Sequence, residues 1–217
     1  MSRTAAPLLL AAATLLSTPA IAQEAGPVME RAARTYRGLS ALQADFKQVV
    51  ANEMVGTFES RGTLAQAGAS RLSMRFSDPP GEAIIIDGTS IWIYAPSTTP
   101  GQVIRTPIAK AQGYGVNLLA WLLDRPAERY HATYLRGDRI GDTPVDVVRL
   151  TPKAKDLPFS QATLWLAQSD ALPRRLEVIE NSGNRRTLTL SKLRPNAKLP
   201  SGTFSFTPPR GVRVIDQ

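Results

Sequence analysis

Hydrophobic positions at the start of the chain recur with helical spacing and then change to strand spacing. Over residues 24–39 the apolar positions return at intervals of three and four, which predicts one amphipathic helix. From Leu42 onward the period becomes two, so alternate side chains face one side of a strand. The positions that share a face in the first three predicted strands are Leu42, Ala44, Phe46, Gln48 and Val50, then Phe58, Ser60, Gly62 and Leu64, then Leu72, Met74 and Phe76.

The clearest hairpin in the sequence follows the turn Asp78-Pro79-Pro80-Gly81. Two apolar runs, at 83–86 and 90–95, flank Asp87-Gly88, which predicts a two-residue loop. A sheet that is apolar on both sides needs a cover on both sides, so we expect helices on one face and a ligand or partner on the other. The two predicted faces carry Ile84, Ile86, Ile91 and Ile93 on one side and Ile85, Trp92 and Tyr94 on the other.

Further short strands bring the predicted total to about eleven, joined by short turns, which is typical of an antiparallel sheet, sandwich or barrel. They lie at 102–105, 130–136, 145–150, 162–167, 174–180 and 185–193. One segment, residues 116–124, is instead a compact apolar helix candidate, preceded by Gly113 and Gly115. It fits two interpretations: ordinary core filling, or a lid over a concave surface.

The N-terminus has the pattern of a secretory signal peptide. An apolar stretch over residues 5–16 precedes Ala20-Ile21-Ala22, the small-x-small pattern that signal peptidase recognises. The stretch is too short to cross about 30 Å of hydrocarbon as a helix. We therefore expect residues 1–22 to be removed, so that one exported domain of residues 23–217 begins at Gln23.

Composition removes several classes of function. The chain has no cysteine, which excludes disulfides, thiol catalysis and lipid attachment to a cysteine. His131 is the only histidine, and no G-x-S-x-G motif is present, so we expect no catalytic triad, no metal site and no cofactor. A pair of carboxylates for glycoside hydrolysis is not excluded by composition, but most acidic residues lie at turns or polar strand faces, and we predict that the protein is not an enzyme.

The chain is basic, with a formal net charge of +8. A basic balance often indicates nucleic-acid binding, but export argues against that partner. The two remaining interpretations are a docking surface for acidic proteins or anionic lipids, and an ordinary solvated surface.

Several short motifs resemble those of the LolA family of periplasmic lipoprotein carriers, in the same order and over nearly all of residues 23–217. They are Phe46-Lys47-Gln48, then Gly62-Thr63-Leu64, the hairpin Ile84-Ile85-Ile86-Asp87-Gly88 with Ile91-Trp92-Ile93-Tyr94, then Leu150-Thr151-Pro152-Lys153, and finally Phe204-Ser205-Phe206-Thr207-Pro208-Pro209-Arg210-Gly211-Val212.

The resemblance implies a mainly β fold with helices: an unclosed, strongly curved antiparallel sheet, or half-barrel, with a helical lid over an apolar cavity. It implies a monomeric periplasmic carrier of acylated lipoproteins, loaded by an inner-membrane LolCDE-type transporter and emptied by an outer-membrane LolB-type receptor. The missing lipid-attachment cysteine favours carrier over receptor. The residues expected to face the cavity are Leu64, Leu72, Met74, Ile84, Ile91, Ile93, Leu119 and Leu122.

One departure from the family concerns the lid. An Arg-Pro pair commonly precedes the third strand, and that arginine is thought to hold the lid shut, whereas Gly68-Ala69 stand here. Arg71 or Arg75 is a candidate substitute, and without one we expect weaker lid closure. Two alternative functions stay open: the lipid- or lipoprotein-sensing domain of a regulatory protein, and a carrier of other lipids.

Overall fold

The computed structural model describes residues 24–110, 117–155 and 157–217. The predicted signal peptide and the loop with Gly113 and Gly115 lie outside these residues, so both remain predictions.

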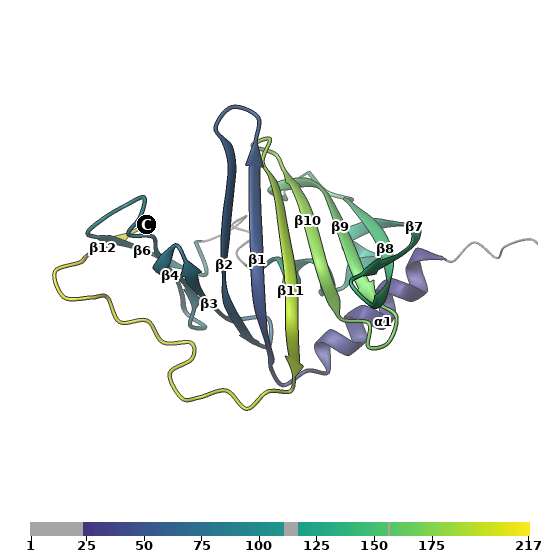
Figure 1. Cartoon of the computed structure of the whole chain (residues 1–217), viewed down its shortest axis with the longest axis horizontal. Helices are drawn as coiled ribbons and strands as arrows, with labels where there is room; N and C mark the ends of the chain where they lie inside the picture. Colours follow the sequence, from purple (N-terminus) through teal and green to yellow (C-terminus); the bar gives the residue numbers. More distant parts are fainter. Residues whose placement is uncertain (1–23, 111–116, 156) are drawn as a thin grey trace, which may run out of the picture.

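Twelve strands form one strongly curved sheet (Figure 1). Their order across the sheet is β12-β6-β5-β4-β3-β2-β1-β11-β10-β9-β8-β7. Within the described ranges β12 and β7 have no strand partner on their outer sides, so the sheet is not closed, which confirms the predicted half-barrel. The strands are β1 Leu42–Asn52, β2 Gly56–Ala67, β3 Arg71–Asp78, β4 Pro80–Ile86, β5 Ser90–Tyr94, β6 Gln102–Pro107, β7 Tyr130–Ile140, β8 Thr143–Pro152, β9 Phe159–Ala167, β10 Pro173–Glu180, β11 Arg185–Pro195 and β12 Arg213–Asp216.

Eleven of these strands pair in the antiparallel way that the sequence predicts. The twelfth, β12, was not predicted, and it pairs parallel to β6. It has only four residues, and its partner lies more than a hundred residues earlier in the chain, so neither alternation nor a local turn marks it.

Among the described residues, three helices lie on the concave side of the sheet: α1 Ala25–Arg37, α2 Leu118–Leu123 and α3 Pro126–Arg129. Helix α1 packs against α3 and strands β7 and β8 (Figure 1). Val28, Met29 and Ala32 on α1 are buried in the same apolar core as the inward-facing strand residues. The predicted helix at 116–124 is confirmed as the shorter α2, whereas α3, a single turn begun by a proline, was not predicted.

The β4–β5 hairpin presents its isoleucine face to the concave side. Ile84 pairs with Ile93, and Ile86 with Ile91. The turn differs by one residue from the prediction, because the Asp87 amide donates to the Ser90 carbonyl at 3.1 Å, and Gly88 has the positive φ of 105°. The two turn residues are therefore Gly88 and Thr89. The side chain of Asp87, which precedes them, accepts hydrogen bonds from the backbone amides of Thr89 and Ser90.

The outer face of this hairpin is covered by the chain itself rather than by a ligand or partner. The segment 196–212 crosses the convex side of the sheet between β11 and β12 (Figure 1). Its Phe206 ring lies 5.7 Å from Trp92 and 5.8 Å from Tyr94, centroid to centroid. This corrects the expectation from the two-sided apolar pattern: the motif around Phe206 supplies the second cover.

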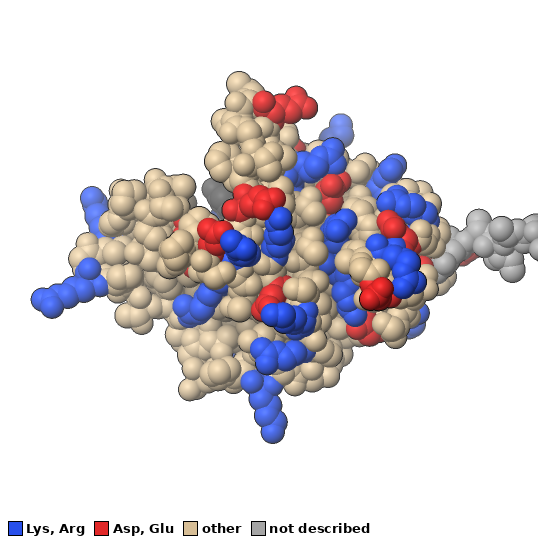
Figure 2. Space-filling view, in the orientation of Figure 1, with Lys and Arg blue, Asp and Glu red and all other residues tan. Residues whose placement is uncertain are grey.

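Charges of both signs are interspersed on the sheet face seen in Figure 2. Cross-strand ion pairs account for several of them: Lys47 with Glu59 at 2.8 Å, Arg185 with Glu177 at 2.7 Å, and Lys192 with Asp45 at 2.9 Å. This face therefore has the mixed pattern of a solvated surface and not a patch of one sign.

Candidate functional site

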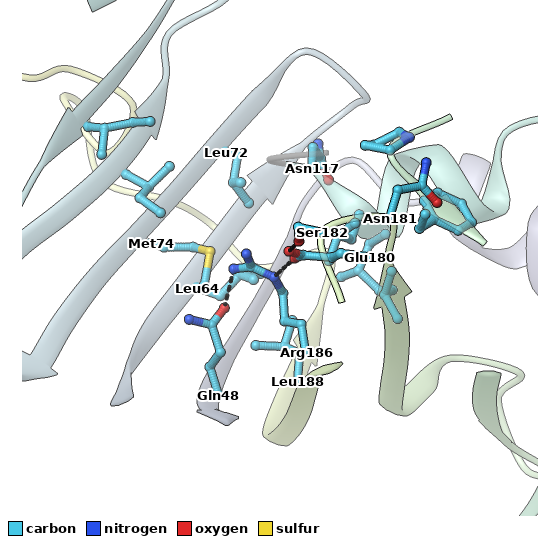
Figure 3. A pocket seen from close by; sticks show the side chains of 17 residues that line it. Gln48, Leu64, Leu72, Met74, Asn117, Glu180, Asn181, Ser182, Arg186 and Leu188 are labelled. Atoms are coloured by element: carbon cyan, nitrogen blue, oxygen red, sulfur yellow. Dashed lines mark hydrogen bonds and ion pairs between the residues drawn. The ribbon is translucent and has the colours of Figure 1, made fainter. Parts of the chain in front are cut away.

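A cavity of about 560 Å³ lies between the concave face of the sheet and helix α2 (Figure 3). Most of its wall is apolar, and the apolar lining comes from eight strand or helix elements and one loop residue. These residues are Leu64, Leu72, Met74, Ile84, Ile93, Leu118, Leu119, Pro158, Phe159, Val178 and Leu188.

Sheet register explains why four of these side chains meet. Leu64 pairs with Met74, Met74 with Ile84, and Ile84 with Ile93. The four residues therefore form one row across β2, β3, β4 and β5, and the pleat directs every member of the row to the same face. The alternation of apolar and polar residues determines which face of the sheet each side chain occupies. The hairpin turns determine how neighbouring strands are aligned.

The structure brings six of the eight predicted residues to the cavity wall. Ile91 and Leu122 do not line it, although both are buried in the adjoining core. Ile91 lies in the next row of the sheet, opposite Ile86, and Leu122 lies one turn beyond Leu119 on α2. Contact between ligand and any of the eight stays a prediction.

One end of the cavity is polar, and none of its residues is among the eight predicted from the sequence to face the cavity. Arg186 donates from Nε to Glu180 Oε1 at 2.7 Å and from Nη1 to Gln48 Oε1 at 3.3 Å (Figure 3). Asn181 and Ser182, from the turn after β10, line the same end. The alternation of side chains along each strand places Gln48, Glu180 and Arg186 on inward faces. This period is the feature of the sequence that could have identified them.

The Glu180 carboxylate at this end of the cavity is ionised, and both of its oxygens accept hydrogen bonds. Partial burial raises the pKa of Glu180, but the hydrogen bond and charge of Arg186 outweigh it, together with hydrogen bonds from Asn184 and Ser182. The pKa of Glu180 therefore lies below its usual range. Its Oε2 accepts the Asn184 amide at 3.1 Å and the Ser182 hydroxyl at 3.3 Å.

Helix α2 is tethered at the position where the family arginine is absent. Asn117 caps the helix, its Oδ1 accepting the Ala120 amide at 3.2 Å, and its Nδ2 donates to the Ala69 carbonyl at 3.0 Å. Gly68 has a φ of 58°, which explains a glycine in this turn. Gln66 Nε2 donates to the Gly68 carbonyl at 3.1 Å and holds the turn from the other side.

Arg71 and Arg75 do not take the place of that arginine. Both lie on the convex face of β3, opposite to Leu72 and Met74. Arg75 Nη2 donates to the Ser205 carbonyl at 3.2 Å, so it holds the segment that covers the outer face. Among the described residues, neither arginine has a hydrogen bond or ion pair to α2.

No helix within residues 24–110, 117–155 and 157–217 has the length and apolar character needed to cross a membrane.

Residues 37–207 match the family model LolA, described as outer membrane lipoprotein carrier protein. The outer-membrane lipoprotein carrier protein of Chromobacterium violaceum is 27% identical over 209 residues, which cover 96% of each chain. The protein of the same name from Dechloromonas aromatica is 29% identical over 179 residues, covering 81% of each chain. A solved structure of an uncharacterized conserved protein from Thermus thermophilus has a TM-score of 0.56 at 12% identity, covers 88% of this chain and 98% of that one, and shows the fold alone.

Proposed function

Since the chain belongs to the LolA family of outer membrane lipoprotein carrier proteins, we propose that it is a periplasmic carrier that binds the acyl chains of lipoproteins beneath α2. It moves them from the inner to the outer membrane. The observation that carries this proposal is the cavity, whose wall is aliphatic over most of its area and polar at one end. Its volume of about 560 Å³ falls in the range of small-ligand sites.

Burial of hydrocarbon supplies the binding energy. Each methylene transferred from water is worth about 0.8 kcal/mol, so one long acyl chain offers on the order of 10 kcal/mol before costs. Ordering the chain and moving the helix reduce that figure. A net affinity well below the gross value suits a protein that must release its cargo.

The lining suits a carrier and not a catalyst. Most of the side chains around the cavity are apolar, and the arginine and the glutamate that line it neutralise each other at 2.7 Å. Loading by a LolCDE-type transporter and delivery to a LolB-type receptor are part of the proposal. Export is part of it as well, and the predicted N-terminus of the mature protein is Gln23, which mass spectrometry of periplasmic material would check.

The direct test is to identify what the protein carries. We expect mass spectrometry of protein purified gently from a periplasm to find acylated peptides, and we expect a synthetic dipalmitoylglyceryl-cysteine lipopeptide to displace a fluorescent acyl probe. Free phospholipid or glycolipid as the sole cargo would instead favour a carrier of other lipids. Tight association with a regulatory protein, with no transfer of lipopeptide to a LolB-type receptor, would favour the sensor alternative.

A further inference from the structure

The polar end of the cavity contains an ion pair on the concave face of the sheet. Arg186 of β11 and Glu180 at the end of β10 are both partly buried, with side chains 31% and 21% exposed. They occupy the same wall as Val178 and Leu188, directly beyond the aliphatic lining. An acyl chain seated along Leu64 and Leu188 would place its polar end beside this pair (Figure 3).

The pair presents hydrogen-bond donors without a net charge. Arginine has five N–H donors, and among the described residues Arg186 uses Nε for Glu180 and one Nη1 hydrogen for Gln48. Its Nη2 group stays available for a ligand. Both Glu180 oxygens already accept hydrogen bonds, so the carboxylate acts as a fixed counter-ion to the guanidinium.

We propose that Arg186 and Gln48 form a subsite for the neutral ester or amide carbonyl that joins an acyl chain to its cargo. Glu180 makes this subsite reject an ionised carboxylate. A carboxylate that accepts a hydrogen bond from Nη2 would lie within about 6 Å of Glu180, where like charges repel. An ester carbonyl accepts the same hydrogen bond without that repulsion. The subsite rests on the proposed carrier function, and it distinguishes esterified or amidated acyl chains from free fatty acids.

The same two strands provide a matched control pair on the other face. Glu177 of β10 accepts a hydrogen bond from Arg185 Nη1 of β11 at 2.7 Å, a length equal to that of the inner pair. Glu177 and Arg185 do not line the cavity. A substitution there changes the net charge by the same amount without altering the proposed subsite.

The experiment compares two ligands of equal chain length, 1-monopalmitoylglycerol and palmitate, at a pH where palmitate is ionised. Both are assayed by displacement of a fluorescent acyl probe from the full-length mature protein. We expect the wild-type protein to favour the ester by about tenfold, the order expected when one charged interaction is removed. Glu180→Gln should lower that ratio about tenfold, because Arg186 is then an unneutralised cation, whereas Glu177→Gln should leave it unchanged.

Two results would overturn the subsite while leaving the carrier function intact: an ester-to-acid ratio that Glu180→Gln does not change, or an equal change in Glu177→Gln. Failure of the wild type to bind either ligand or the lipopeptide would overturn both proposals. If Glu180→Gln unfolds, the double variant Glu180→Gln/Arg186→Gln removes both charges together. It should lose the ester preference, and a retained preference would contradict the role of Arg186.

Discussion

The rings of Phe46 and Phe76 meet edge to face across strand β2, with centroids 5.1 Å apart and an interplanar angle of 84°. Gly62 lies between them in the sheet, paired with Phe46 on one side and Phe76 on the other. The rings reach each other because the residue between them has no side chain. This contact links the two motifs Phe46-Lys47-Gln48 on β1 and Gly62-Thr63-Leu64 on β2.

Gly62→Ala should destabilise the protein by about 2–3 kcal/mol. A Cβ at this position would lie 2.0 Å from the Arg75 carbonyl oxygen and 2.8 Å from the Phe76 Cα, and both atoms belong to the backbone. Urea unfolding followed by circular dichroism measures the free energy of unfolding. Gly137→Ala in β7 is the matched control, because a Cβ there meets only the Tyr134 hydroxyl at 3.7 Å. Equal losses in the two variants would contradict the close approach.

Leu119→Asp should abolish uptake of an acyl probe while the sheet stays folded. Leu119 lies on α2, is 2% exposed and lines the cavity. A carboxylate there places a charge against hydrocarbon, which is unfavourable unless it is paired. Probe fluorescence measures uptake, and circular dichroism checks the sheet. Ile108→Asp, at an aliphatic residue that is 37% exposed, is the control and should bind normally. Undiminished uptake by Leu119→Asp would refute the role of α2 as a cover.

Asn117→Asp should speed both loading and release of an acyl probe, each by about fivefold, the equivalent of one hydrogen bond of about 1 kcal/mol. Aspartate keeps the oxygen that caps α2 but cannot donate to the Ala69 carbonyl, so the variant loses the tether and retains the cap. The cavity is present beneath the tethered helix, and we therefore expect the rates to change more than the affinity. Stopped-flow fluorescence measures both rates.

Asn117→Ala removes the tether and the cap together. Its free energy of unfolding should therefore be lower than that of Asn117→Asp by about 1 kcal/mol, the usual contribution of an N-cap. Unchanged rates in both variants would show that this hydrogen bond does not restrain the helix.

Acid should weaken the β4–β5 hairpin through Asp87. Partial burial raises its pKa, but hydrogen bonds from the Ser90 and Thr89 amides, the Trp92 indole and the Thr89 hydroxyl outweigh it and lower the pKa to about 2. A lowered pKa means that the stabilisation is complete above about pH 4 and is lost as pH falls toward 2. After allowance for solvent screening, we expect protonation of Asp87 to lower the free energy of unfolding by about 1 kcal/mol.

Urea unfolding at several pH values would measure this effect. Asp87→Asn should be less stable near neutral pH and should lose less stability between pH 4 and 2 than the wild type. Asp142→Asn, at an exposed turn, is the control. A wild-type profile that Asp87→Asn does not alter in this interval would contradict the assignment.

Strand alternation and turn chemistry predicted the sheet because both are local signals, and the row from Leu64 to Ile93 follows from them. The polar end of the cavity was not predictable in the same way. Arg186 and Glu180 each resemble solvated charges in the sequence, and only the curvature of the sheet and the turn at 181–184 bring them together inside the concave face. The role of Phe206 depended likewise on where segment 196–212 crosses the sheet.

Unpaired strand edges invite association between molecules, and the two ends of this sheet avoid it by different means. At β7 the register shifts between Tyr134 and Arg136, and the exposed pair Arg136–Asp138 follows, so an incoming strand meets a bulge and charges. At the other end the edge strand is β12, which has only four residues and covers the longer strand β6. Loss of these last residues would therefore expose a six-residue edge, and aggregation in concentrated solution is its expected consequence, before any change in ligand binding.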